Sequence, residues 1–365
     1  MNFSVDKELL VECLSRSHPH AAITIEDHKF SQYDVEPGTN NTSEIFGVSV
    51  EYHVDGELLK EFLVFKVPFL SANFESLRPT GLYEQETYMY AAILPEMAKI
   101  VELRMVPRYY CTTASNVLVL EDLCSQGYYL VDRSAASFEQ SALVFESLAE
   151  FHACSVKFDR LHPNKLSPVA NETLYTKTLI DDTLKLTVPE IKVADICRIA
   201  NRSCDFNVLN HGKLKTNNVL LKNDSDGKPV AVKLIDFQTC RWNSPALDLV
   251  YFCMISMDFE TFESRYDELL DRYLARLNDT LARLECDQKY TKEDHDHDLS
   301  ASKLYQIFTL FWVGVLDVRA TVKEFNYEDV TEWDEKIIRA IRESATFRNN
   351  FVKWFKHFQE KGYFE

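Results

Sequence analysis

The sequence predicts an α+β fold with two lobes: a small N-terminal lobe built on an antiparallel sheet and a large, mostly helical C-terminal lobe. Residues 46–68 alternate apolar and polar side chains around a central Asp-Gly pair, which is the pattern of an antiparallel hairpin. Residues 208–249 read as short apolar strands that each end in a polar loop. Beyond them the apolar spacing is helical, over residues 246–257, 259–286, 299–318 and 331–358.

The length and composition of the chain limit what it can be. Its 365 residues, of which 46% are hydrophobic, suffice for two lobes and a sizeable core. The net charge of −17 argues against nucleic acid or an anionic membrane surface as the main partner. The N-terminus lacks the pattern of a signal peptide, and the longest apolar run, Phe308 to Leu316, is about half as long as a bilayer requires. We therefore expect a cytoplasmic monomer.

The cysteine content also predicts a cytoplasmic protein. They are odd in number, scattered along the chain, and include no Cys-x-x-Cys pair. This usage predicts reduced thiols rather than a disulfide framework or a zinc site. The nine are Cys13, Cys111, Cys124, Cys154, Cys197, Cys204, Cys240, Cys253 and Cys286.

In the small lobe, the sequence first predicts a helix over residues 5–15 with Ser4 as its cap, and then an extended segment over residues 21–33. The hairpin follows, and its return strand, residues 62–68, carries one lysine, Lys66, in an apolar run. One interpretation is an edge strand whose ammonium group reaches water. The other is a lysine that grips phosphate and pairs with a glutamate of the next helix.

A helix predicted over residues 80–94 offers that glutamate. We favour Glu86 over Glu84, because Glu86 lies one turn before Tyr90 on the same face, and because a buried lysine needs a charged partner. The segment 36–44 stands where a phosphate-covering loop would lie, with Thr42 or Ser43 as contacts. Its single glycine is at least as consistent with an ordinary turn.

Two further strands are predicted over residues 107–121, and we place the lobe boundary just after them, near Asp122. The small lobe is then residues 1–122 and the large lobe residues 123–365. An amphipathic helix follows over residues 137–155.

Two segments of the large lobe carry residues that could be reactive or bind metal. His152 and Cys154 suggest a nucleophile pair, but near neighbours on a helix do not face each other, so we interpret His152 as a packing residue. Residues 292–298, Lys-Glu-Asp-His-Asp-His-Asp, are of metal-binding types, but a solvated acidic segment before a helix is the more ordinary explanation.

The central stretch, residues 208–249, contains the candidate catalytic and metal-binding residues. Protein kinases place His-x-Asp in one polar loop, Asn five residues after that Asp, and a second Asp in the next loop; the Asn and the second Asp hold magnesium through oxygen ligands. Here His211, Asn218 and Asp236 occupy three of these positions. The fourth, the aspartate that accepts the proton of the attacking hydroxyl, is Lys213.

In order, the chain thus has a strand lysine, a helix glutamate, a hinge, His-Gly followed by Asn, Asp-Phe and Asp-Leu. This order resembles the small-molecule kinases related to choline kinase and aminoglycoside phosphotransferases, and is most similar to the ecdysteroid kinase-like family of arthropods. The resemblance covers nearly the whole chain. It is carried by Phe65-Lys66-Val67-Pro68, Tyr83-Glu84-Gln85-Glu86, Tyr90, Leu94-Pro95-Glu96, Leu118–Leu123, and most specifically by Lys233–Thr239 and Ser244–Asp248.

The resemblance implies a two-lobed protein-kinase-like fold that uses ATP and magnesium. The reaction implied is phosphoryl transfer to a hydroxyl of an ecdysteroid-like or other small apolar alcohol. By position, Lys66 would hold phosphates, Glu86 would orient Lys66, and Asn218 and Asp236 would hold both nucleotide and magnesium.

The hinge and the catalytic loop complete the implied site. Glu121 and Leu123 would meet the adenine through the hinge backbone. His211 and Lys213 would lie in the catalytic loop, and Asp248 would support that loop rather than touch substrate.

Lys213 leaves the activity open. A general base is worth ~10²–10⁴-fold in rate, roughly 3–5 kcal/mol, so its loss predicts slow turnover with nucleotide binding retained. A charged Lys213 would pair with Asp236 and compete with magnesium. The alternatives are a slow kinase, a pseudokinase that binds nucleotide or a steroid-like ligand without turnover, and a scaffold with an unused pocket.

Overall fold

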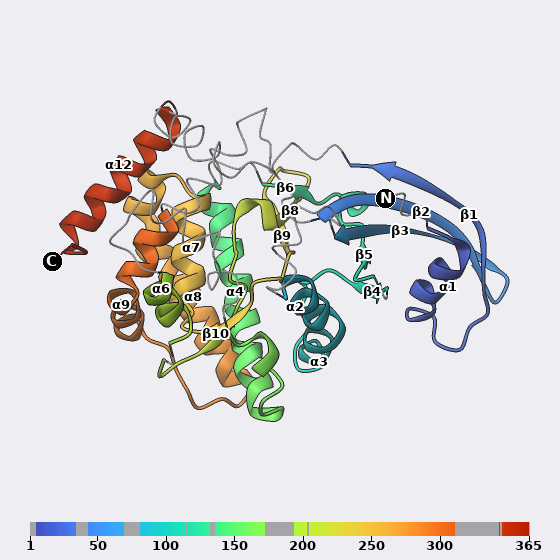
Figure 1. The fold of residues 1–365 in the computed structure, drawn as a ribbon, viewed down its shortest axis with the longest axis horizontal. Helices are drawn as coiled ribbons and strands as arrows, with labels where there is room; N and C mark the ends of the chain where they lie inside the picture. Colours follow the sequence, from blue (N-terminus) through green and yellow to red (C-terminus); the bar gives the residue numbers. More distant parts are fainter. Residues whose placement is uncertain are drawn as a thin grey trace.

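The computed structural model describes residues 5–33, 43–68, 81–113, 115–131, 136–171, 193–202, 204–310, 343 and 345–364. A five-stranded sheet with helix α1 forms one end of the molecule, and helices α6, α8, α9 and α12 lie toward the other (Figure 1). Helices α2 and α4 and the strands β8 and β9 lie between them.

The sheet of the small lobe is antiparallel throughout, in the order β1-β2-β3-β5-β4. Its strands are β1 Ile23–Gln32, β2 Ser43–Val54, β3 Glu57–Pro68, β4 Tyr109–Thr112 and β5 Leu118–Glu121. The predicted hairpin is the β2–β3 pair. Asp55 and Gly56 connect it with positive φ values of 51° and 92°, which is the backbone of a two-residue turn that matches the twist of the strands.

Helix α1, Lys7–Ser15, packs against this sheet and completes a small core. Its buried face is Leu10, Cys13 and Leu14. The cap predicted at Ser4 is wrong: the N-cap is Asp6, whose carboxylate accepts a hydrogen bond from Leu9 N at 2.8 Å, and Ser4 lies outside the described residues.

The helix predicted over residues 80–94 is present as three consecutive pieces. These are α2 Leu82–Tyr88, a π-helical turn η3 Met89–Ile93, and α3 Leu94–Met97. Tyr90, Ile93 and Leu94 are buried and belong to the large core rather than to the core under the sheet. This helix therefore ties the position of Glu86 to the large lobe.

The central stretch folds into short hairpins, as predicted. β7 Val208–Asn210 pairs with β10 Arg241–Asn243, and β8 Val219–Asn223 pairs with β9 Pro229–Leu234 on one side and with β6 Tyr129–Leu130 on the other. A 3-10 turn, η7 Thr216–Asn218, leads into β8. The polar loops 211–215 and 235–240 thus begin where β7 and β9 end.

Helices form the rest of the large lobe, and α4 and α8 make its central packed pair. Helix α4 begins with a capping box in which Ser137 and Gln140 satisfy each other's backbone donors. The helices are α4 Phe138–Leu161, α6 Val193–Ala200, α7 Ala246–Ser256, α8 Phe259–Arg283, α9 Lys292–Ala301 and α12 Ala345–Glu360, with short 3-10 turns at Cys124–Gln126 and Ser167–Val169. Residues 303–310 are also helical. Among the described helices none is both long and apolar enough to cross a bilayer.

The interpretation of residues 292–298 as a solvated segment before a helix is wrong, because these residues are themselves the first turns of α9. Its side chains at 295 and 298 are buried: His295 Nε2 lies 2.6 Å from the Tyr266 hydroxyl, and Asp298 accepts a hydrogen bond from the Tyr290 hydroxyl at 3.0 Å. Within the described part of the chain, no group of three or more potential ligand side chains is arranged to hold a metal.

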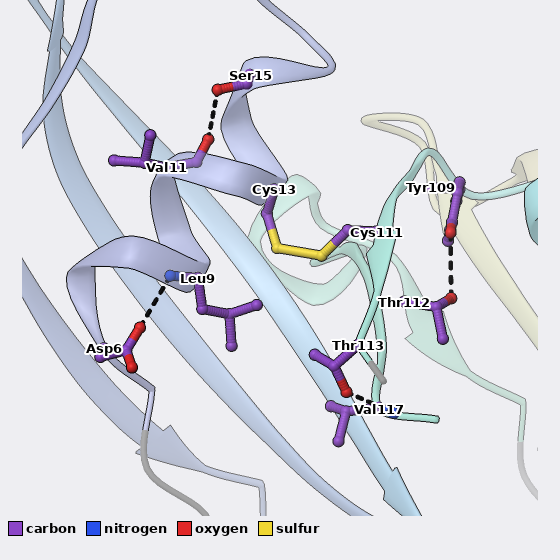
Figure 2. Close-up of a disulfide and its surroundings, with 10 residues drawn as sticks. All are labelled: Asp6, Leu9, Val11, Cys13, Ser15, Tyr109, Cys111, Thr112, Thr113 and Val117. Atoms are coloured by element: carbon purple, nitrogen blue, oxygen red, sulfur yellow. Dashed lines mark hydrogen bonds between the residues drawn. A yellow bond between two sulfur atoms is a disulfide. The ribbon is translucent and has the colours of Figure 1, made fainter. Parts of the chain in front are cut away.

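The expectation that every cysteine is a reduced thiol is also wrong. Cys13 of α1 and Cys111 of β4 form a disulfide, shown in Figure 2, with 5.2 Å between their Cα atoms. Both residues are buried in the small core. The bond closes a loop across 98 residues of sequence and joins the helix to the sheet. Because of this disulfide, the cysteines do not indicate a reducing compartment.

We predict that this disulfide contributes substantially to stability, because it restricts the unfolded chain over a long loop. Cys13→Ala/Cys111→Ala, or reduction of the wild-type protein, should lower the free energy of unfolding by roughly 2–5 kcal/mol, as measured by urea unfolding. Cys124→Ala, which changes an exposed thiol, is the control and should keep the full sensitivity to reductant. Equal stability of oxidised and reduced wild-type protein would contradict the prediction.

Candidate active site

A buried ion-pair cluster lies where the two lobes meet. Lys66 of β3 places its Nζ 2.7 and 2.8 Å from the two carboxylate oxygens of Glu86 in α2, and 2.6 Å from Oδ1 of Asp236 in the loop after β9. β3 lies between β2 and β5, so Lys66 is not on an edge strand. The interpretation as an edge lysine reaching water is excluded, and the predicted pairing with Glu86 is present. Glu84 is exposed instead, with Oε1 3.4 Å from the Asn116 amide.

Burial and the neighbouring charges shift the pKa values of Lys66 and Glu86 in opposite directions. Burial alone would lower the pKa of Lys66, but Asp236 and Glu86 together outweigh it and raise that pKa. Burial likewise raises the pKa of the Glu86 carboxyl, and Lys66 opposes that rise. The lysine is thus held as an ammonium group between two carboxylates.

Lys213 reaches the same carboxylate from the other side. Its Nζ lies 2.9 Å from Asp236 Oδ2, which also accepts a hydrogen bond from Gln238 Nε2 at 3.1 Å. Burial alone would raise the pKa of Asp236, but Lys213 and Lys66 hold it well below the ordinary range. Both carboxylate oxygens are therefore occupied by ammonium groups, and the pairing of Lys213 with Asp236 expected from the sequence is confirmed.

The loop that carries Lys213 is held by Asp248, near the start of α7. Its carboxylate accepts hydrogen bonds from the backbone N–H of His211 at 2.6 Å and of Gly212 at 2.9 Å. His152 Nε2 lies 3.3 Å from the same carboxylate, and His152 Nδ1 lies 2.7 Å from the Tyr273 hydroxyl. Asp248 thus contacts the loop backbone, as expected. The sequence analysis missed His152 as its partner and treated it as a packing residue.

His211 supports the loop as well. It is fully buried: Nε2 donates to Ile235 O at 2.8 Å, and Nδ1 accepts from Lys213 N at 3.4 Å. These bonds imply the neutral tautomer with the proton on Nε2, and burial accordingly lowers the pKa of His211. Predicted as a catalytic residue, His211 has the contacts of a residue that joins the two loops.

Asn218 fixes the loop at its far end. Its Nδ2 donates to Lys213 O at 2.8 Å, and its backbone oxygen accepts from Ile235 N at 3.0 Å. Asn218 therefore lies beside both Lys213 and the residue that precedes Asp236.

The hinge contains a contact that the sequence analysis missed. Lys233 of β9 donates to Glu121 Oε1 and to Val106 O, both at 2.9 Å, and so joins the large lobe to the end of β5. The signal was a single lysine in an apolar strand, the same signal that identified Lys66. Burial would raise the pKa of Glu121, but Gln126, Arg108 N and Lys233 together lower it.

Two further residues that the sequence predicts at the nucleotide site, Leu123 and Ser43, lie within the described part of the chain. Leu123 is buried directly after the hinge. Ser43 is buried at the start of β2, and Thr42 with most of the segment 36–44 lies outside the described residues.

The donor set does not fit a magnesium ion in this arrangement. Asp236 and Asn218 have the oxygen atoms that magnesium prefers. However, each oxygen of Asp236 faces an ammonium group within 3 Å, at 2.6 Å from Lys66 and 2.9 Å from Lys213. A divalent cation bound to this carboxylate would have to displace Lys213 and would be repelled by both lysines.

The family model described as the ecdysteroid kinase-like family matches residues 37–199 and 181–286 of the chain. The matched region is more than half of the chain and contains Lys66, Glu86, the hinge and both central loops.

The chain belongs to the ecdysteroid kinase-like family. This membership, with the antiparallel sheet beside a helical lobe, confirms the predicted α+β kinase-like class. Lys213 and the Lys213–Asp236 pair are thus features of an ecdysteroid kinase-like chain.

Two solved structures are similar to this family member at low identity. One is a spectinomycin phosphotransferase in complex with ADP and spectinomycin, at 12% identity, a TM-score of 0.43, and coverage of 96% of this chain and 99% of that one. The other is an ethanolamine kinase of Plasmodium vivax, at 14% identity, a TM-score of 0.42, and coverage of 95% and 91%. No curated protein sequence gives a significant match.

We predict that Gly212 is required for the placement of Lys213. Gly212 has a φ of 81°, and a Cβ there would lie 1.9 Å from Thr239 O, a backbone atom that cannot easily move. Gly227, in the turn between β8 and β9, has nearly the same φ, 80°, with open space around it. Gly227→Ala is therefore a matched control for the backbone strain alone, which costs about 1–2 kcal/mol.

Gly212→Ala should cost roughly 1–3 kcal/mol more than Gly227→Ala in urea unfolding, because of the added collision. Equal losses of stability in the two variants would show that the loop does not need this close approach.

Proposed function

We propose that this chain binds ATP between its two lobes and transfers the terminal phosphoryl group slowly to a hydroxyl of an ecdysteroid-like or other small apolar alcohol. Membership in the ecdysteroid kinase-like family supports the reaction class. The single observation that carries the proposal is the contact of Lys66 with both oxygens of Glu86 and with Asp236. In kinases this lysine–glutamate pair is the arrangement that grips phosphates.

Within the proposal, Lys66 donates to phosphate oxygens and Glu86 orients it. The hinge backbone at Glu121 and Leu123 would meet the adenine, and Asn218 and Asp236 would border the phosphates. In the transfer, a bond forms between the acceptor oxygen and the terminal phosphorus, the bridging P–O bond to ADP breaks, and the hydroxyl proton leaves to solvent.

Slow transfer follows from Lys213. An ammonium group has three N–H donors and no acceptor, so it cannot take the proton of the attacking hydroxyl. Lys213 Nζ instead donates to Asp236 Oδ2 at 2.9 Å. Positioning and charge stabilisation by Lys66 remain, and these supply most of the rate enhancement in phosphoryl transfer.

The second candidate function is nucleotide or steroid-like ligand binding without turnover, and the Lys213–Asp236 pair favours it. The resemblance implies a magnesium ion, but the contacts of Asp236 with Lys66 and Lys213 do not support one at this carboxylate. The cytoplasmic location and the monomeric state stay predictions from the sequence.

We predict that Lys213→Asp raises the rate of phosphoryl transfer at least tenfold, because a general base is worth ~10²–10⁴-fold. The assay incubates purified protein with ATP, magnesium and a panel of ecdysteroids and other apolar alcohols, and measures phosphorylated product by mass spectrometry. Lys222→Asp, which places the same charge change on an exposed strand residue of β8, is the control and should leave the rate unchanged.

Lys66→Met should abolish product in both backgrounds. If Lys213→Asp forms phosphorylated product and the wild type forms none, the wild-type chain is a pseudokinase. Wild-type turnover that Lys213→Asp leaves unchanged or lowers would contradict the assigned position of Lys213.

A further inference from the structure

The ion-pair cluster is electrically balanced without a metal. Two ammonium groups, of Lys66 and Lys213, face two carboxylates, of Glu86 and Asp236, so the formal charge of the four side chains is zero. All four are largely withdrawn from water, with side chains between 5% and 22% exposed. Charge imbalance is costly at such a site, since water screens it poorly.

An aspartate at position 213 would change this balance by two charges. The cluster would then have one ammonium group against three carboxylates, with a formal charge of minus two. That deficit equals the charge of one divalent cation, so a cation bound at this site would restore the balance. Lys213 removes the deficit with a covalently attached cation.

The geometry places this cation within reach of a ligand. Among the four side chains Lys213 is the most exposed, at 22%, compared with 13% for Asp236 and 10% for Lys66. Its ammonium group has three N–H donors, and one of them is directed to Asp236 Oδ2. The remaining donors suit anionic oxygen atoms.

The position of Lys213 is also fixed in advance. Asn218 Nδ2 donates to its carbonyl oxygen at 2.8 Å, and His211 Nδ1 accepts from its N–H at 3.4 Å. The adjacent Gly212 N–H is held by Asp248 at 2.9 Å. Little ordering of the loop is therefore left to occur when a ligand binds, which favours affinity.

We propose that Lys213 takes the place of the divalent cation in this site, so that the protein binds the metal-free form of a nucleoside triphosphate, with Lys66 and Lys213 both donating to its phosphate oxygens. This inference rests on the proposed nucleotide binding and specifies the form of the ligand. A magnesium ion on the phosphates would neutralise the charge that the two lysines recognise and would be repelled by both. The metal complex is thus the weaker ligand.

The test is isothermal titration of the full chain with ATP, once in excess EDTA and once in excess magnesium, for the wild type, Lys213→Met, Lys213→Asp and Lys228→Met. Lys228 is an exposed lysine in the turn before β9 and is the control for loss of a positive charge. Thermal unfolding of each variant checks that it is folded.

The wild type and Lys228→Met should bind ATP in EDTA at least as tightly as in magnesium. Lys213→Met should lose at least tenfold in affinity in EDTA. Lys213→Asp should bind in EDTA at least tenfold more weakly than the wild type and should recover on addition of magnesium.

A wild-type affinity for ATP that is lower in EDTA than in magnesium would overturn the replacement of the cation and leave the proposed nucleotide binding intact. ATP binding in EDTA by Lys213→Met that is as tight as that of the wild type would also overturn the replacement of the cation, without affecting the proposed nucleotide binding. Absence of ATP binding by the wild type and by Lys213→Asp, in both buffers, would overturn this inference together with the proposed function. A fall in wild-type affinity in EDTA overturns the inference even if a variant fails to fold.

Discussion

The carboxylate of Asp236 is the point on which the site depends, because two lysines from opposite directions share it. Lys66 comes from the central strand of the small lobe and Lys213 from a loop of the large lobe. The shared carboxylate therefore joins the lobes as well as fixing the two cations. Removing one partner of such a buried pair is typically more costly than the pair is stabilising, because a charge is left unmatched. Asp236 also has a φ of 72°, an unusual backbone for a residue with a side chain, which the surrounding contacts maintain.

The supporting contacts make this arrangement rigid. Asp248 holds two backbone N–H groups of the Lys213 loop and is itself buried against His152. His211 joins that loop to the strand end that carries Asp236. These contacts hold the backbone around residue 213, so the side chain at that position determines the charge of the cluster.

Short-range pattern was enough to predict what depends on neighbours along the chain. The β2–β3 hairpin followed from alternation and an Asp-Gly turn. The Lys66–Glu86 and Lys213–Asp236 pairs, whose partners are 20 and 23 residues apart, followed from the positions of these residues in the kinase pattern. The rest required contacts between distant segments. Nothing local to Cys13 or Cys111 indicates a partner 98 residues away. The burial of His295 in α9 depends on Tyr266 of another helix. Residues 292–298 were interpreted as solvated because their composition is acidic.

If Lys213 replaces the divalent cation as proposed, it keeps metal ions away from Asp236. The most direct measurement is the binding of Mn²⁺ to nucleotide-free protein, followed by electron paramagnetic resonance of the unbound ion. The account predicts the same Mn²⁺ stoichiometry for the wild type and Asp236→Asn, and one additional bound ion for Lys213→Asp. A wild-type protein that binds one Mn²⁺ more than Asp236→Asn would contradict the account.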